Sequence, residues 1–271
     1  MRIYVSVDLE GIYRVDRYDT HENRSKEYRF WKKHVGQLMF EEVYALYEGL
    51  ILKGASEVVV FDSHGGGDTI LNLPRNYSKL TLARRVETHN ELFPLMNLQV
   101  DGIILWGYHV KAGSKRGKLN HTASRRVKNV KINNREVGEV YLHGLYAFNK
   151  RIPLIAVSGD NGVGLEVKED IGNIPFFNAN IGTGLSRKNY LRSIKEFVLA
   201  LPLDEVLKIN QSLNWPAQTT LEVSYKNFLT NIARWILRKQ FKHSRLKGLS
   251  SCIYEKGSFV QQWDQFNGFS S

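Results

Sequence analysis

The sequence predicts an α/β protein with a central, mainly parallel sheet flanked by helices and a smaller C-terminal α+β segment. Two apolar runs, 2–7 and 57–62, enclose a helical stripe over 31–53, which is the order of a βαβ unit with parallel strands. Short apolar runs then alternate with further helical patterns, as they do in α/β proteins. A chain of 271 residues is long enough to bury the core of one such domain and to carry an appendage.

The individual elements follow from local patterns. Apolar residues at helical spacing, from Val35 to Ile51, predict the helix over 31–53, and Gly54 stands at its C-cap position. The polar, charge-rich stretch 14–29 before it is expected to be a loop. Further strands are expected near 80–83, 102–106, 152–157, 175–178 and 219–225, further helices at 87–96, 138–149, 162–170, 187–200 and 203–210, and a hairpin with strands 127–132 and 136–137 around Asn133 and Asn134.

The C-terminal end differs from the rest of the chain in composition. Residues 1–215 are expected to form the α/β domain that holds the functional site, and 216–271 a basic, aromatic-rich segment. Within that segment, 226–242 has the pattern of an amphipathic basic helix. Because its aromatic side chains need burial, the segment is expected to pack on the domain or on a neighbouring subunit.

Composition excludes several kinds of site and partner. A single cysteine, Cys252, allows neither an intramolecular disulfide nor a thiolate zinc cluster. The first residues lack the apolar core of a signal peptide and no run has the length of a membrane span, so we expect a cytoplasmic protein with no membrane partner. The formal net charge of +11 is compatible with nucleic acid, but no basic segment carries stacking aromatics, and no nucleic-acid partner is expected.

Polar side chains with metal-binding atoms follow four of the predicted strands. Asp8 and Glu10 follow the first strand, His64 the second, His109 the strand at 102–106, and Asp160 the strand at 152–157. Any one of these histidines alone is compatible with a hydrogen-bonded structural imidazole. Together they indicate a shared site, because parallel strands bring their carboxyl ends to one crevice. Imidazoles and carboxylates without sulfur suit zinc, with manganese, cobalt or iron as alternatives.

The same segments carry a family resemblance. The chain resembles the D-aminopeptidase family of binuclear zinc peptidases through five motifs in order: Ser6-Val7-Asp8-Leu9-Glu10-Gly11, Asp62-Ser63-His64, Gly107-Tyr108-His109, Asn120-His121-Thr122 and Gly138-Glu139. The resemblance covers residues 1–160 well and 161–225 loosely. It implies an α/β subunit assembled into a homodecamer of two pentamers, acting on short peptides with an N-terminal D-residue.

The resemblance also implies roles for individual residues. Asp8 would bridge two zinc ions, with Glu10 and His64 completing one site and His109 and Glu139 the other. His121 would be the catalytic histidine, which the family describes as a nucleophile. On chemical grounds we expect an imidazole there to transfer a proton to the leaving nitrogen or to stabilise the oxyanion, and direct attack stays open. For Glu139 the alternative is an ordinary carboxylate in the first turn of a helix.

Other residues give weaker indications of a functional role. Asn120, His143 and Asp160 are candidates for contacts to a metal ligand or to substrate, although Asp160 also suits a helix cap and His143 a packed or surface position. Histidines 21, 34, 89 and 243 are expected at the surface. The loop 111–126 is basic, which indicates a substrate with an acidic group or a free carboxylate; its cations are Lys111, Lys115, Arg116, Lys118, Arg125 and Arg126.

The expected function is therefore a metal-dependent aminopeptidase that hydrolyses short peptides or aminoacyl amides. Two alternatives stay open. The same ligands also suit a two-metal phosphoesterase. A non-catalytic assembly or binding protein of the same fold is the other alternative, which the filled ligand positions make less attractive.

Overall fold

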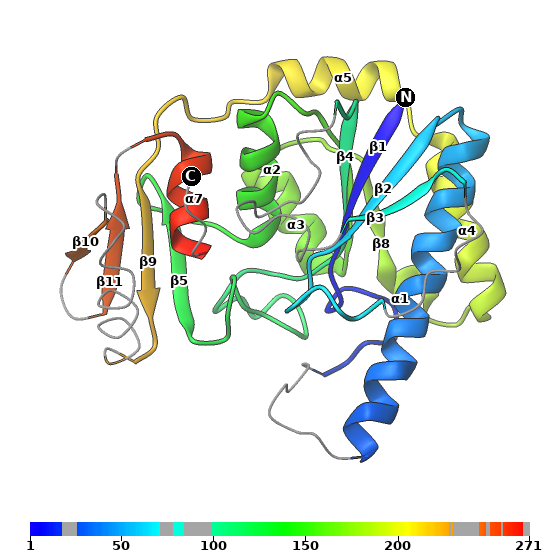
Figure 1. The fold of residues 1–271 in the computed structure, drawn as a ribbon, viewed down its shortest axis with the longest axis horizontal. Helices are drawn as coiled ribbons and strands as arrows, with labels where there is room; N and C mark the ends of the chain where they lie inside the picture. Colours follow the sequence, from blue (N-terminus) through cyan, green and yellow to red (C-terminus); the bar gives the residue numbers. More distant parts are fainter. Residues whose placement is uncertain are drawn as a thin grey trace.

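A computed structural model describes residues 1–17, 26–70, 78–83, 99–227, 229, 244–247, 250–255 and 257–267. These residues form a parallel sheet at the centre, helices on both of its faces, and a separate antiparallel sheet to one side (Figure 1). Among them, no helix combines the length and the apolar character that crossing a membrane requires.

The parallel sheet places the ends of its strands at one edge. In the described part of the chain it has six strands in the order β3–β2–β1–β4–β7–β8, with the bounds β1 (Arg2–Val7), β2 (Glu57–Asp62), β3 (Leu80–Ala83), β4 (Gly102–Tyr108), β7 (Leu154–Gly159) and β8 (Phe176–Asn178). The chain extends the sheet from β1 in one direction and then, from β4, in the other. At such a switch point the loops diverge and leave a crevice at the carboxyl edge.

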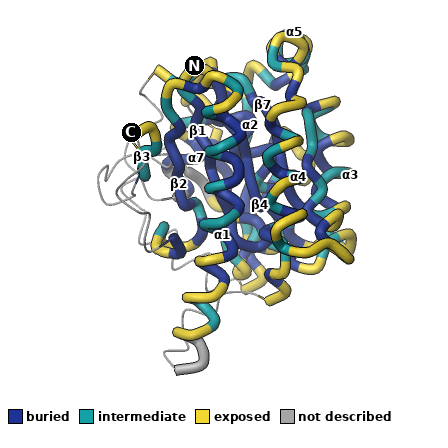
Figure 2. Tube along the Cα trace, turned by 90° about the vertical axis from the view of Figure 1, so that its right-hand side faces the viewer, coloured by how far each residue is buried: buried dark blue, intermediate teal, exposed yellow. Residues whose placement is uncertain are grey.

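Helices cover the two faces of this sheet (Figure 1). On one face lie α1 (Lys26–Leu52) and α4 (Arg187–Ala200), and on the other α2 (Glu139–Asn149) and α3 (Asn161–Asp170). Side chains alternate along β1, so that Ile3 and Val5 join the core beneath α1 and α4, whereas Tyr4 joins the core beneath α2 and α3. The central strands β1, β2, β4 and β7 are buried along almost their whole lengths (Figure 2), as expected for a parallel sheet covered on both faces. The edge strands β3 and β8 are only partly buried.

The antiparallel sheet joins the middle of the chain to its C-terminal part. Its order is β10–β11–β9–β5–β6, with the bounds β5 (Val127–Ile132), β6 (Arg135–Glu136), β9 (Leu221–Tyr225), β10 (Ser244–Lys247) and β11 (Ser251–Tyr254). The C-terminal helix α7 (Phe259–Asn267) contacts both α2 and β9, and it buries Phe259, Trp263 and Phe266. Strands from 127–136 and from 221–254 thus share one sheet, and the predicted domain division at residue 215 stays a prediction.

The predicted fold class is confirmed, including the parallel sheet, the flanking helices and the smaller C-terminal α+β part. The strands at 57–62, 80–83 and 127–132 have the predicted bounds. A helix, α5 (Leu203–Ser212), was predicted over 203–210. The predicted helix 87–96, most of the predicted helix 226–242, and histidines 21, 89 and 243 lie outside the described residues, whereas His34 is exposed on α1 as expected.

Several predicted bounds are wrong. Helix α1 begins at Lys26, inside the predicted loop 14–29, because its first turns project from the body and need no apolar face, as the 77% exposure of Phe30 shows. Strand β7 begins at Leu154 and not at 152, because the N–H of Ile152 bonds to the carbonyl of Ala147 at the end of α2. The elements β10, β11 and α7 were not predicted.

Candidate metal centre

The ends of β1 and β4 lie in direct backbone contact. The N–H of Asp8 donates to Trp106 O at 2.8 Å, and the N–H of Gly11 donates to Gly107 O at 2.7 Å. A Cβ atom at Gly107, whose φ is +70°, would lie 2.4 Å from the carbonyl oxygen of Asp8. Glycine there permits both the backbone conformation and the close approach. As a result, the carboxylates that follow β1 lie beside the histidine that follows β4.

Asp8 lies between two histidines, with a different oxygen toward each. His64 Nδ1 is 3.3 Å from Asp8 Oδ1 and 3.0 Å from Glu10 Oε2. His109 Nε2 is 3.3 Å from Asp8 Oδ2 and 3.3 Å from Glu139 Oε1. The predicted ligands therefore form two groups, one with His64 and Glu10 and one with His109 and Glu139, which share the carboxylate of Asp8.

The orientation of His109 provides a test of whether this cluster fits a cation. His109 Nδ1 lies 3.0 Å from the carbonyl oxygen of Val110, which only accepts, so the ring must donate from Nδ1. In the neutral ring the lone pair of Nε2 then points at the oxygens of Asp8 and Glu139. Nε2 is buried and makes no well-directed hydrogen bond to any described residue. An imidazole held by a backbone carbonyl, with its other nitrogen facing carboxylates, is the usual arrangement of a metal-ligating histidine.

His121 reaches the cluster from the loop after β4. A β-bridge between Val110 and Asn120 closes the base of this loop and brings His121 back beside His109. The two imidazole rings stack with centroids 3.9 Å apart and planes 13° apart. His121 Nε2 is 3.7 Å from Glu139 Oε1, and that oxygen also accepts the N–H of Ala123 at 2.7 Å.

Two combinations of these side chains have atoms close enough to share one ion. One ligand atom from each of Asp8, Glu10 and His109 lies within 4.8 Å of the others, and the same holds for His109, His121 and Glu139. The second combination places His121 within reach of the same ion as His109 and Glu139. Its assignment as the catalytic histidine stays a prediction.

Electrostatics in the cluster favour positive charge between the carboxylates. Burial opposes ionisation of Asp8 and Glu139. At Glu139 the attraction of His109 outweighs burial and lowers the pKa to about 2, and at Asp8 the attraction of His109 and His64 lowers the pKa well below its usual range. Burial and repulsion from Asp8 raise the pKa of Glu10. Despite burial, Glu139 and Asp8 raise the pKa of His109 well above its ordinary value. Burial and repulsion from His109 lower the pKa of His121 to about 4. A divalent cation bound between these carboxylates would supply the positive charge that they favour.

The three residues with weaker signals have distinct positions. Asp160 caps α3, where its side chain accepts the N–H of Val163 at 3.0 Å. Asn120 lies at the base of the loop that carries His121. His143 is buried one turn beyond Glu139 on α2 and contacts the hydroxyl of Tyr108.

A buried polar network behind the cluster was not predicted. The hydroxyl of Tyr108 lies 2.8 Å from Ser6 Oγ and 2.8 Å from His143 Nδ1, so it joins β1, β4 and α2. Ser6 lies 102 residues from Tyr108, and Tyr108 lies 35 from His143. No local pattern relates residues at those separations.

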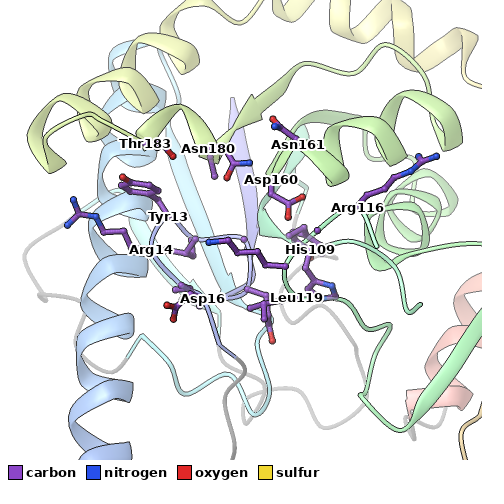
Figure 3. A pocket seen from close by; sticks show the side chains of 18 of the residues that line it. Tyr13, Arg14, Asp16, His109, Arg116, Leu119, Asp160, Asn161, Asn180 and Thr183 are labelled. Carbon is purple, nitrogen blue, oxygen red and sulfur yellow. The ribbon is translucent and has the colours of Figure 1, made fainter. Parts of the chain in front are cut away.

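A pocket of about 640 Å³ opens beside the cluster at the carboxyl edge of the sheet (Figure 3). Glu10 and His109 belong to its lining, together with residues from the loops that follow β1, β4, β7 and β8. Sequence reasoning did not name Tyr13, Asn180 and Thr183, which also line it. Their positions just after parallel strands were the available signal.

The fold and the cluster together define the class: a doubly wound α/β protein with buried carboxylates and imidazoles at its switch point. The D-aminopeptidase family model matches residues 1–233. The chain therefore belongs to the D-aminopeptidase family, and the predicted resemblance is confirmed.

Two comparisons give the degree of similarity. A D-aminopeptidase of Bacillus subtilis (strain 168) is 28% identical over 175 residues, which are 64% of this chain and 61% of that protein. The alignment thus spans less than two thirds of the relative's length. Among solved structures, the Zn-dependent D-aminopeptidase DppA from Bacillus subtilis, described as a self-compartmentalizing protease, matches with a TM-score of 0.78 and 19% identity over 98% of this chain and 96% of that chain. The structural match supports the fold.

Proposed function

We propose that this chain is a metal-dependent aminopeptidase that hydrolyses short peptides or aminoacyl amides through a binuclear zinc site. The observation that carries the proposal is the carboxylate of Asp8, whose two oxygens face His64 and His109 separately. Membership of the D-aminopeptidase family and the zinc dependence named for the structural relative support it. A preference for an N-terminal D-residue belongs to the proposal for the same reason.

In this proposal Asp8 would serve both ions, Glu10 and His64 would hold one, and His109 and Glu139 would hold the other. Zinc bound there would lower the pKa of a shared water and polarise the scissile carbonyl. The chain's own contribution is to keep the ligands in place and to exclude bulk water. Asp8, Glu10 and His109 are each less than 9% exposed.

His121 is the proposed proton carrier. Its imidazole is neutral at pH 7, because its pKa is lowered to about 4 by burial and by His109. A neutral imidazole can accept a proton during attack on the carbonyl and deliver it to the leaving nitrogen. His121→Ala should therefore keep metal while kcat falls by about 10²- to 10⁴-fold, the usual contribution of a general acid–base group.

Self-association is also proposed, because the structural relative is described as a self-compartmentalizing protease. The expected assembly is a homodecamer. Sedimentation velocity at several concentrations would measure its mass, and a stable monomer would contradict this part of the proposal.

The decisive experiment measures zinc per chain and hydrolysis together. Wild type is compared with Asp8→Asn and with Asp101→Asn, an exposed carboxylate at the amino end of β4 that serves as the matched control. The substrates are D- and L-aminoacyl amides, short peptides and an aryl phosphate. The proposal expects two zinc ions and amide hydrolysis in wild type and in Asp101→Asn, and the loss of both in Asp8→Asn. Hydrolysis of the phosphate alone would favour the phosphoesterase, and absence of metal under zinc-replete conditions would contradict the site.

A further inference from the structure

The pocket beside the metal centre has the volume of a small-ligand site. Its volume of about 640 Å³ falls within the range of about 300–1,000 Å³ that is typical of pockets for small molecules. Glu10 and His109 belong to its lining, and so do Asp160, Asn161 and Thr183, which follow β7 and β8 in the chain. A ligand held at the metal centre therefore has room to extend across the sheet edge by only a few residues of peptide.

The loop between His109 and His121 forms part of the pocket wall and is held firmly. The bridge between Val110 and Asn120 closes its base. Its middle packs on the first turn of α3, where a Cβ atom at Gly162 would lie 2.6 Å from the carbonyl oxygen of Arg116. The Arg116 side chain anchors the loop further, since its Nη1 lies 2.7 Å from Glu169 Oε2. These contacts hold the loop backbone in place, so the side chains with which this loop lines the pocket start from fixed positions.

Four cations line the pocket, and two of them point elsewhere. Arg116 is paired with Glu169 and extends away from the pocket (Figure 3). Arg14 also extends outward, and its guanidinium lies 5.3 Å from the centroid of the Tyr13 ring (Figure 3). Lys115 and Lys118 remain; both are exposed, and within the described residues neither has an ion-pair partner. They are the cations available to a ligand.

The acidic lining residues do not cancel this charge completely. Glu10 belongs to the metal cluster, and Asp160 accepts the N–H of Val163 as the cap of α3. Asp16 is exposed on the loop after β1. The lining therefore combines a candidate cation site at Glu10 and His109 with two lysines, and these charges match a zwitterionic ligand.

We propose that this pocket binds the part of a short peptide that follows the scissile bond, and that Lys115 and Lys118 recognise a carboxylate there. The inference rests on the proposed aminopeptidase function, which places the substrate's amino end at the metal centre. In a short peptide the free α-carboxylate follows the scissile bond within a residue or two, and the two lysines line the pocket into which that part of the substrate extends. An acidic side chain in the same position offers the same chemistry.

Four substrates separate these two sources of carboxylate. They are alanyl-glycine, alanyl-glycine amide, alanyl-aspartate amide and alanyl-asparagine amide, each with D- and with L-alanine. Because exposed ion pairs contribute modestly, wild type should prefer the free acid over the glycine amide by about five- to twentyfold in kcat/KM. A similar preference for the aspartate amide over the asparagine amide would assign recognition to the side-chain carboxylate as well.

The lysines are tested by Lys115→Gln/Lys118→Gln beside the matched control Lys188→Gln/Lys208→Gln, which removes two exposed charges from α4 and α5. The acid-to-amide ratio should fall toward one in the first variant and stay at the wild-type value in the control. Equal turnover of acid and amide by wild type would overturn the carboxylate inference while the peptidase stands. A ratio unchanged in Lys115→Gln/Lys118→Gln would overturn the role of the lysines. If wild type with zinc bound hydrolyses none of the four substrates in either the D or the L form, the proposed function itself would be overturned.

Discussion

Replacing His121 by glutamine in chelator-treated protein should change how stability depends on pH. The His121 ring stacks on His109 at 3.9 Å, and only 15% of its side chain is exposed. Burial and repulsion from His109 lower its pKa from 6.5 to about 4. A neutral imidazole is thus built into the folded protein, whereas in the unfolded chain the same group takes up a proton near pH 6.5.

The sign of the effect follows from the direction of the shift. The unfolded state binds the proton more readily, so the stability that His121 contributes is fully present above pH 6.5 and is lost as the pH falls toward 4. The shift from 6.5 to about 4 corresponds to about 3 kcal/mol in total. At pH 5 the wild type should have lost about 2 kcal/mol relative to a variant with no titrating group at that position.

Urea unfolding at pH 8, 7, 6 and 5 measures this difference. The free energy of unfolding of His121→Gln minus that of wild type should rise by about 2 kcal/mol between pH 8 and pH 5. His34→Gln, which replaces an exposed histidine on α1, is the control for removing an imidazole elsewhere in the chain.

A difference that stays constant for His121→Gln would refute the reasoning. The imidazole would then titrate alike in the folded and unfolded states, and neutrality of His121 at pH 7 could no longer be attributed to its surroundings. Its proposed role as a proton acceptor would lose that support.

Two further substitutions test the framework of the site. Tyr108→Phe removes a buried hydroxyl that lies 2.8 Å from both Ser6 and His143. The free energy of unfolding, measured in urea at a fixed zinc concentration, should fall by about 1–3 kcal/mol. No loss would show that the network does not stabilise the fold. Arg187→Ala leaves the carboxylate of Glu42, 1% exposed, without its cationic partner, and should cost about 3–5 kcal/mol. Burial already raises the pKa of Glu42 to about 7, so that carboxyl takes up a proton at pH 6. The loss of unfolding free energy in Arg187→Ala should therefore be smaller at pH 6 than at pH 8. Equal losses at the two pH values would contradict this expectation.

The parts of the fold that were predictable are those with strong local patterns. The strand 57–62 and the body of helix 31–53 are buried elements with clear periodicity, and both are present. The strands β10 and β11 depend on tertiary contacts, because they form by pairing with each other and with β9. The start of β7 was misplaced because its first apolar residues complete the turn after α2, which depends on tertiary contacts.

The residues of the candidate metal cluster could be named from the sequence, but their geometry could not be predicted. Asp8, Glu10, His64 and His109 could be named because parallel strands end at a common edge. The sharing of Asp8 between two histidines depends on the order of β2, β1 and β4 and on the contact between the ends of β1 and β4.

The sequence by itself determined the fold class, the family and the chemical identity of the candidate ligands, because these depend on residue type and on local periodicity. Only the tertiary structure decided which oxygen of Asp8 faces which histidine, that Tyr108 joins Ser6 to His143, and that Arg116 turns away from the pocket. Those contacts join residues from distant elements, and their distances are set by strand order and by close backbone approach. A local stretch of sequence determines neither the strand order nor the close backbone approach.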